Sequence, residues 1–243
     1  MNQHTKNLIL LHLYNFRYLT RKQIQNLLKH KQSAKVILWL KELTQAGYIR
    51  RIHNKKTITI PATYSLGVKS RKYLKNQPEF QDMNLELLNR IYWEPKLSPQ
   101  FRQHCVFLAD IFLSLKYSEP NLRFYTKTML SGMAHMILPL PDAYFSVDDK
   151  PYFLDIIDEL PARMILRRRI RQYFDYYDQN TWQDHNLKPF PAIIIILPDE
   201  RSKKYLHKFI RRMLEENPDL NFYLPTWEQI KVSGLKLIRS VTK

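Results

Sequence analysis

Two aspartates, Asp142 and Asp155, are the residues of this chain whose type and spacing point most directly to chemistry. Each lies in a short apolar segment that predicts a β-strand, and the two segments flank a turn at residues 148–150. Such a hairpin would place the two carboxylates on adjacent strands. Carboxylate pairs of this kind bind Mg²⁺ or Mn²⁺ in metal-dependent phosphodiester hydrolysis, so both residues are candidate metal ligands and candidate catalytic residues.

The segments around these aspartates predict the elements that position them. The expected order is a helix from Phe101, strands at 121–128, 141–147 and 152–157, a basic helix at 161–177, a buried strand at 192–197, a helix at 202–216 and a strand at 221–224. This is the order of the PD-(D/E)XK nuclease fold, in which one Asp opens the second strand and an acid-x-Lys motif lies on the third. We therefore expect an α/β nuclease-like domain at residues 101–243, ending in a basic C-terminal segment.

One residue departs from that nuclease pattern. Two positions after Asp155, where strand alternation would direct a lysine toward the same site, the chain has Ile157. Isoleucine can neither orient a water molecule nor stabilise negative charge. An arginine of the following helix would have to supply the cation, and Arg169 is the candidate we choose from residues 167–169. The alternative is that both aspartates are structural carboxylates paired with these arginines.

The first part of the chain predicts a winged helix-turn-helix at residues 1–75, followed by a helical linker at 76–100. Apolar spacing indicates helices at 5–16, 21–30 and 33–46, then strands at 48–52 and 57–66 around a basic turn. Thr20 and Gln23 form a capping-box pattern, and Gly47 suits the end of the third helix. In this layout the third helix enters the major groove of DNA and the hairpin lies beside it.

These elements define the candidate DNA contacts. The groove-facing candidates are Lys31, Gln32, Lys35 and Trp39; the phosphate-binding candidates are Arg50, Arg51, Lys55 and Lys56, together with Arg167, Arg168 and Arg171 of the second domain. The overall charge agrees, because 39 Lys and Arg against 22 Asp and Glu give a net charge of +17. A polyanion such as double-stranded DNA is the expected partner of that charge.

Composition also excludes several classes of protein. A hydrophobic content of 44% is too high for a disordered basic tail. The single cysteine, Cys105, excludes an intramolecular disulfide framework and a multi-cysteine zinc site. Four glycines leave no phosphate-binding loop for ATP. The longest aliphatic run, residues 193–197, is too short to cross a bilayer, so we expect a cytoplasmic protein with no membrane partner.

Several segments of the chain resemble the replication-relaxation proteins of plasmids and other mobile elements. They are residues 16–28 (FRYLTRKQIQNLL), 40–51 (LKELTQAGYIRR), 103–104, 141–145 (PDAYF), 153–156 (FLDI) and 167–177 (RRRIRQYFDYY). Such proteins usually have Arg-His at 103–104, Glu at 155, a second acid at 157 and Lys at 169, four residues before a tyrosine matching Tyr173. The resemblance implies a role in processing plasmid DNA.

The combined expectation is an α+β chain, with a winged helix followed by a nuclease-like domain, that acts as a DNA-binding accessory factor in plasmid replication or conjugative mobilisation. Candidate protein partners are a relaxase, a replication protein or a second copy of the chain. Two alternatives stay open. One is a Mg²⁺- or Mn²⁺-dependent endonuclease that uses Asp142 and Asp155, and the other is a winged-helix transcriptional regulator.

Overall fold

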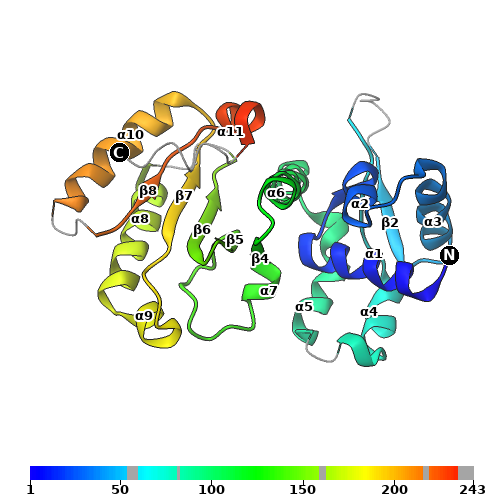
Figure 1. The fold of residues 1–243 in the computed structure, drawn as a ribbon. Coiled ribbons are helices and arrows are strands. Elements are labelled where there is room, and N and C mark those ends of the chain that lie inside the picture. The colour runs from blue at the N-terminus through cyan, green and yellow to red at the C-terminus, as the bar shows by residue number, and fades with distance from the viewer. Residues whose placement is uncertain (54–59, 81–82, 159–162, 216–218, 235–243) are drawn as a thin grey trace. The chain divides into compact units, whose positions relative to one another are not determined.

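The structure is a computed structural model that describes residues 1–53, 60–80, 83–158, 163–215 and 219–234. The chain forms two compact units, Met1–Leu113 and Ser114–Lys243, and the division falls within helix α6 (Pro99–Ser118) (Figure 1). The mixture of helices and strands confirms the α+β class. Over the described residues, every helix is too short or too polar to cross a membrane.

Unit 1 begins with three helices, α1 (Gln3–Phe16), α2 (Arg21–Leu27) and α3 (Ser33–Gln45). Helix α1 begins two residues earlier than predicted, and Asn2 caps it by accepting a hydrogen bond from the Thr5 amide. The capping box predicted at α2 is present, because Thr20 and Gln23 each bond the other's backbone amide. Ile9, Leu10 and Ile24 are fully buried, so these helices share a core.

A three-stranded antiparallel sheet completes this part of unit 1. Its strands β1 (Leu19–Thr20), β2 (Ile49–Ile52) and β3 (Thr63–Leu66) are arranged in the order β1-β3-β2. Gly47 ends α3 with a φ of 78°, as its position predicted. A Cβ at Gly67 would lie 2.4 Å from the Gly47 carbonyl oxygen, so only glycine permits this close approach before α4 (Val68–Lys75).

Residues 76–100, which we expected to form a helical linker, lie within unit 1. They include η1 (Pro78–Phe80), α5 (Leu85–Asn89), η2 (Arg90–Tyr92) and η3 (Glu94–Lys96). Glu94 is only 3% exposed, and its Oε1 lies 2.8 Å from Nε of Arg17. The Tyr18 hydroxyl donates to the Glu94 carbonyl. These bonds join the segment to the end of α1.

Unit 2 contains a five-stranded mixed sheet. Its strands are β4 (Arg123–Thr126), β5 (Ala143–Val147), β6 (Lys150–Ile156), β7 (Ala192–Ile196) and β8 (Phe222–Tyr223), in that spatial order. The first three strands are antiparallel, whereas β6, β7 and β8 run parallel. The turn between β5 and β6 has two residues, Asp148 and Asp149, rather than the three predicted at 148–150, because Lys150 pairs with Val147 in the sheet. The positive φ values of Asp148 and Asp149, 47° and 61°, suit such a two-residue turn.

The parallel strands are connected by helices. The helices of this unit are α7 (Lys127–Leu130), α8 (Arg163–Asp178), α9 (Thr181–Asn186), α10 (Glu200–Leu214) and α11 (Trp227–Ser233). Helices α8 and α10 pack on one face of the sheet, where Ile170 and Leu206 share a core with Phe153 and Ile193 (Figure 1). The sequence did not predict α7 or α9, each of which has six residues or fewer.

Candidate functional site

Asp142 and Asp155 lie opposite one another at one end of the β5–β6 hairpin. Ala143 pairs with Leu154, so continuing the antiparallel register by one residue pairs the two aspartates. Asp142 directly precedes β5, and its Oδ2 accepts the backbone amide of Ile156 at 2.8 Å. Strand alternation places Asp155 on the same face as Phe153, which is the face that α8 covers.

Arg169 of α8 occupies the space in front of Asp155. Its Nε lies 2.6 Å from Asp155 Oδ2 and its Nη2 lies 3.0 Å from Oδ1, so the guanidinium binds both carboxylate oxygens. The Tyr173 hydroxyl donates to Asp155 Oδ2 at 2.9 Å. Arg169 Nη1 also donates to the Pro139 carbonyl at 2.6 Å. Asp155 is 6% exposed and Tyr173 is fully buried, so this is a closed, hydrogen-bonded ion pair.

The protonation states of these groups follow from their surroundings. Burial is the largest single influence on the Arg169 guanidinium and lowers its pKa. The charges of Asp155, Tyr173 and Asp142 and the hydrogen bond to Asp155 together outweigh burial and raise this pKa above its ordinary range. Burial and then the Asp155 charge raise the pKa of the Tyr173 hydroxyl well above its ordinary value of 10.0. At neutral pH Arg169 is therefore charged and Tyr173 is a protonated donor.

This arrangement does not fit a bound Mg²⁺ or Mn²⁺. Such ions need several oxygen ligands, whereas Asp155 already accepts three hydrogen bonds from Arg169 and Tyr173. Across the residues that the structure describes, no group of three His, Cys, Asp or Glu side chains could hold a metal. Ile157 packs its side chain against the core of unit 2. A metal would have to displace Arg169 before it could bind Asp155.

The other arginines near Arg169 in α8 are exposed to solvent rather than enclosed beside the aspartates. Arg167, Arg168 and Arg171 are exposed, whereas the Arg169 side chain is 13% exposed. Of the three consecutive arginines considered as the catalytic cation, the structure thus brings only Arg169 to the aspartates. The other two remain candidate phosphate contacts on the outer surface of α8.

In unit 1, the predicted groove-facing residues lie at and before the start of α3. Lys31, Gln32 and Lys35 are exposed, but only Lys35 lies within the helix. Gln32 is the N-cap residue, and its amide donates to Nδ1 of His30 at 3.2 Å. Trp39 is half-buried and packs edge-on against His30, with ring centroids 4.8 Å apart. Trp39 therefore packs against the loop before α3, and only part of its side chain is available to a ligand.

Three further residues of α3 point outward and were not among the predicted DNA contacts. Ile37 and Leu38 are 49% and 56% exposed, and Lys41 is also exposed. Helical periodicity contained this signal, because inward-facing Val36, Leu40 and Leu43 require 37, 38 and 41 to point outward. Of the predicted hairpin contacts, Arg50 is half-buried and Arg51 is exposed on β2. Lys55 and Lys56 lie outside the described residues.

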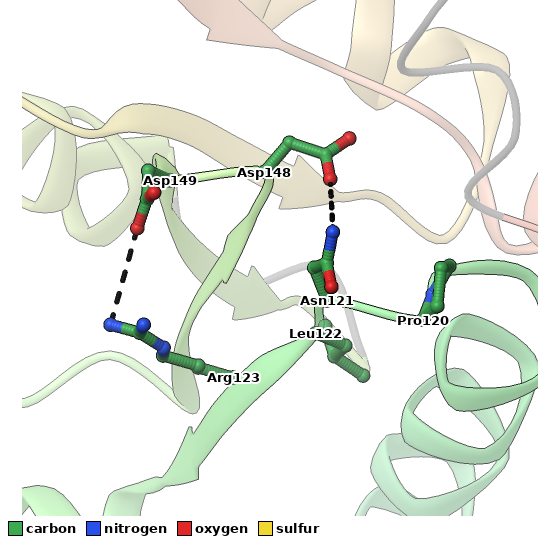
Figure 2. A pocket seen from close by; sticks show the side chains of 6 residues that line it. All are labelled: Pro120, Asn121, Leu122, Arg123, Asp148 and Asp149. Carbon is green, nitrogen blue, oxygen red and sulfur yellow. Dashed lines mark hydrogen bonds and ion pairs between the residues drawn. The ribbon is translucent and has the colours of Figure 1, made fainter.

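A pocket of about 410 Å³ lies at the other end of the β5–β6 hairpin (Figure 2). Arg123 Nη1 and Asp149 Oδ1 are 4.0 Å apart at this pocket, and the Asn121 amide donates to Asp148 at 3.0 Å. The length of β5, five residues, separates the pocket from Asp142 by roughly 17 Å at about 3.3 Å per residue. The pocket is thus separate from the paired aspartates.

Comparisons with known proteins identify the family to which this chain belongs. No curated protein and no solved structure matches the chain. A family model described as Replication-relaxation matches residues 10–191, a range that contains the second half of α1, all of α2 and α3, both aspartates, Arg169 and Tyr173. Because the match extends over more than half of the sequence, this chain belongs to the Replication-relaxation family.

Proposed function

We propose that this chain is a DNA-binding accessory factor in the replication or mobilisation of a plasmid or another mobile element. Membership of the Replication-relaxation family suggests a role in those processes. The observation that carries DNA binding is the exposed basic start of α3, with Lys31 just before the helix and Lys35 in its first turn. A net charge of +17 supports the same partner.

Unit 1 acts as a winged helix in this proposal. Three helices followed by the β2–β3 hairpin, with a short β1 joining the sheet, fit that layout. Helix α3 would enter the major groove, where Lys35 could reach base edges and Ile37 or Leu38 could contact thymine methyl groups. Arg51 of β2 would bind phosphate, which adds affinity without base specificity.

Unit 2 is a nuclease-like domain in the same proposal. Its element order and mixed sheet support the PD-(D/E)XK layout, in which Asp142 and Asp155 would occupy the two acidic positions. Arg169 binds both oxygens of Asp155, so this carboxylate would be unavailable to a catalytic metal. The domain would therefore serve to bind DNA and to contact a relaxase or a replication protein.

A direct binding measurement tests this function. Fluorescence anisotropy with labelled duplex DNA from the element's origin region should detect binding. The logarithm of the association constant should fall linearly with the logarithm of the salt concentration. The variant Lys31→Glu, Lys35→Glu should bind at least about tenfold more weakly. The matched control is Lys72→Glu, Lys75→Glu, which reverses two exposed lysines of α4. Absence of binding at moderate salt, or binding that salt does not affect, would contradict the proposal.

A metal-dependent endonuclease is the second candidate function, because Asp142 and Asp155 oppose each other across the hairpin. In that case Asp142 and Asp155 would hold the divalent ion, which would supply Lewis-acid chemistry for phosphodiester hydrolysis, and Arg169 would have to leave Asp155 first. Incubation of the protein with supercoiled plasmid in Mg²⁺ or Mn²⁺ tests this function. Nicking by the wild type, but not by Asp142→Asn, Asp155→Asn, would establish the endonuclease. Intact plasmid with both proteins would leave DNA binding as the activity of the chain.

A further inference from the structure

Helices α8 and α10 lie side by side in unit 2 and present a row of arginines packed on aromatic rings. The helices share the core residues Ile170 and Leu206. The Arg163 guanidinium carbon lies 4.8 Å from the Tyr205 ring centroid, and that of Arg167 lies 5.5 Å from Tyr205 and 5.3 Å from Phe209. Arg171 lies 5.9 Å from the Phe209 centroid. Three arginines of α8 thus stack on two rings of α10.

This row is spaced regularly and is continuous with further cations. Arg163, Arg167 and Arg171 follow each other at intervals of four residues, which is about 6 Å along a helix. On α10, helical spacing places four more exposed or half-exposed cations on the solvent side of Tyr205 and Phe209. We call the seven residues together the α8–α10 basic surface: Arg163, Arg167, Arg171, Arg201, Lys204, Lys208 and Arg212.

Among the residues of unit 2 that the structure describes, none of the seven cations forms an ion pair with a carboxylate. The ion pairs present there involve other cations, such as Arg169 with Asp155 and Lys203 with Glu200. The acidic residues of the two helices lie at their ends: Asp175 and Asp178 on α8, and Glu200 on α10. Clustered like charges destabilise a folded domain through repulsion. Stability therefore does not explain this cluster, whereas an anionic ligand does.

The aromatic packing suits the arginines to phosphate. A ring against the face of a guanidinium limits its motion and leaves its N–H donors at the edge, where they can form paired hydrogen bonds to phosphate oxygens. Holding these side chains in place before binding reduces the entropy lost on binding. The lysines of α10 would add charge around this ordered row.

We propose that the α8–α10 basic surface is a second nucleic-acid site, which binds the phosphate backbone without reading bases. The choice of nucleic acid over another polyanion rests on the proposed function. Helix α10 follows residue 191, so more than half of this surface lies beyond the residues that the family model matches. With α3 in unit 1, the chain would have two separate DNA-binding faces.

The test compares two triple variants of the full chain by anisotropy with labelled duplex DNA at several salt concentrations. Lys204→Glu, Lys208→Glu, Arg212→Glu changes the proposed site without removing an arginine that packs on Tyr205 or Phe209. Arg123→Glu, Lys150→Glu, Lys188→Glu is the control, because it makes the same change in charge near the Asp148–Asp149 turn. The site variant should bind DNA at least about tenfold more weakly. The plot of log affinity against log salt concentration should also become less steep, by about 2 to 3 in the magnitude of its slope. The control should lose less than about threefold.

Three outcomes would overturn the proposal: an equal loss in both variants, no loss in the site variant, or loss of binding to anionic phosphatidylserine vesicles with DNA binding unchanged. The Lys31→Glu, Lys35→Glu variant, measured in parallel, separates this proposal from the proposed function. Weak binding by that variant alone would retain the proposed function and reject the second site. A further variant, Phe209→Leu, removes the ring beneath Arg167 and Arg171 without changing charge, and should weaken binding about two- to fivefold.

Discussion

Arg168 and Arg169 are consecutive residues of α8, yet their surroundings differ in almost every respect. Arg169 is enclosed with Asp155 and Tyr173 and donates to both oxygens of one carboxylate. Arg168 is exposed to solvent. A charge removed from water needs a partner of opposite charge, whereas an exposed charge does not. The inner edge of α8 therefore contributes to stability, and its outer residues remain available for a ligand.

The largest expected loss of stability follows from removing Arg169, the buried partner of Asp155. Arg169→Ala would leave Asp155 buried without its counter-charge, which should lower the free energy of unfolding by about 3 to 5 kcal/mol. Urea unfolding followed by circular dichroism measures this change.

A double variant tests whether the missing charge pair causes that loss. Asp155→Asn, Arg169→Gln removes both charges and leaves two amide side chains that can still form hydrogen bonds. It should lose less stability than the sum of the losses in the single variants Asp155→Asn and Arg169→Gln, with a coupling of roughly 0.5 to 3 kcal/mol. Additive losses would show that Arg169 contributes through packing rather than through pairing with Asp155.

The third member of the buried cluster should contribute less. Tyr173→Phe removes one hydrogen bond to Asp155 and leaves its ring in place, so the free energy of unfolding should fall by about 1 to 3 kcal/mol at pH 7. The control Tyr117→Phe changes a tyrosine that is 94% exposed and should have little effect. Equal losses in the two variants would contradict a role for the Tyr173 hydroxyl.

The same tyrosine should affect stability at high pH. The pKa of Tyr173 is raised in the folded chain, so its hydroxyl stays protonated where the unfolded chain ionises. Its contribution is present below pH 10 and is lost as the pH rises from about 10 toward the folded-state pKa. Tyr173→Phe should therefore lose less stability than the wild type between pH 9 and pH 11, as measured by urea unfolding at each pH.

Local sequence signals predicted much of the arrangement around these residues. The two-residue turn at Asp148 and Asp149 pairs Val147 with Lys150, and this register places Asp142 opposite Asp155. The capping box at Thr20 and the positive φ of Gly47 were predictable for the same reason, since both depend on residues close in sequence. Strand register and helix ends are thus determined by neighbouring residues.

Contacts between distant segments were less predictable. Three consecutive arginines offered no direct sign that Arg169 alone would meet Asp155, because that contact depends on how α8 packs on the sheet. The rings beneath Arg163 and Arg167 come from α10, about forty residues later, and no local pattern connects them. Helices α7 and α9 are too short to show a clear helical period.

A titration with Mn²⁺ tests whether Arg169 keeps a metal ion away from Asp155. If Arg169 takes the place of a metal, Arg169→Ala should gain affinity for Mn²⁺ and be stabilised by about 1.4 kcal/mol when the ion is at tenfold its Kd. The wild type should not respond, because Arg169 already binds Asp155. Thermal unfolding with and without Mn²⁺ measures both proteins. Stabilisation of the wild type alone would instead show that Arg169 assists a metal, and would favour the endonuclease.

The smallest expected change in stability is for substitution of Arg168, the exposed neighbour of Arg169. Arg168→Ala makes the same chemical change as Arg169→Ala one residue earlier, but no buried carboxylate loses its partner. The free energy of unfolding should therefore change by less than about 0.5 kcal/mol, as measured by the same urea titration. A cost above about 1 kcal/mol would mean that Arg168 also contributes to the folded domain. With the small change, the stability difference between the two variants comes from the pairing of Arg169 with Asp155 and not from helix propensity or overall charge, which both substitutions alter equally.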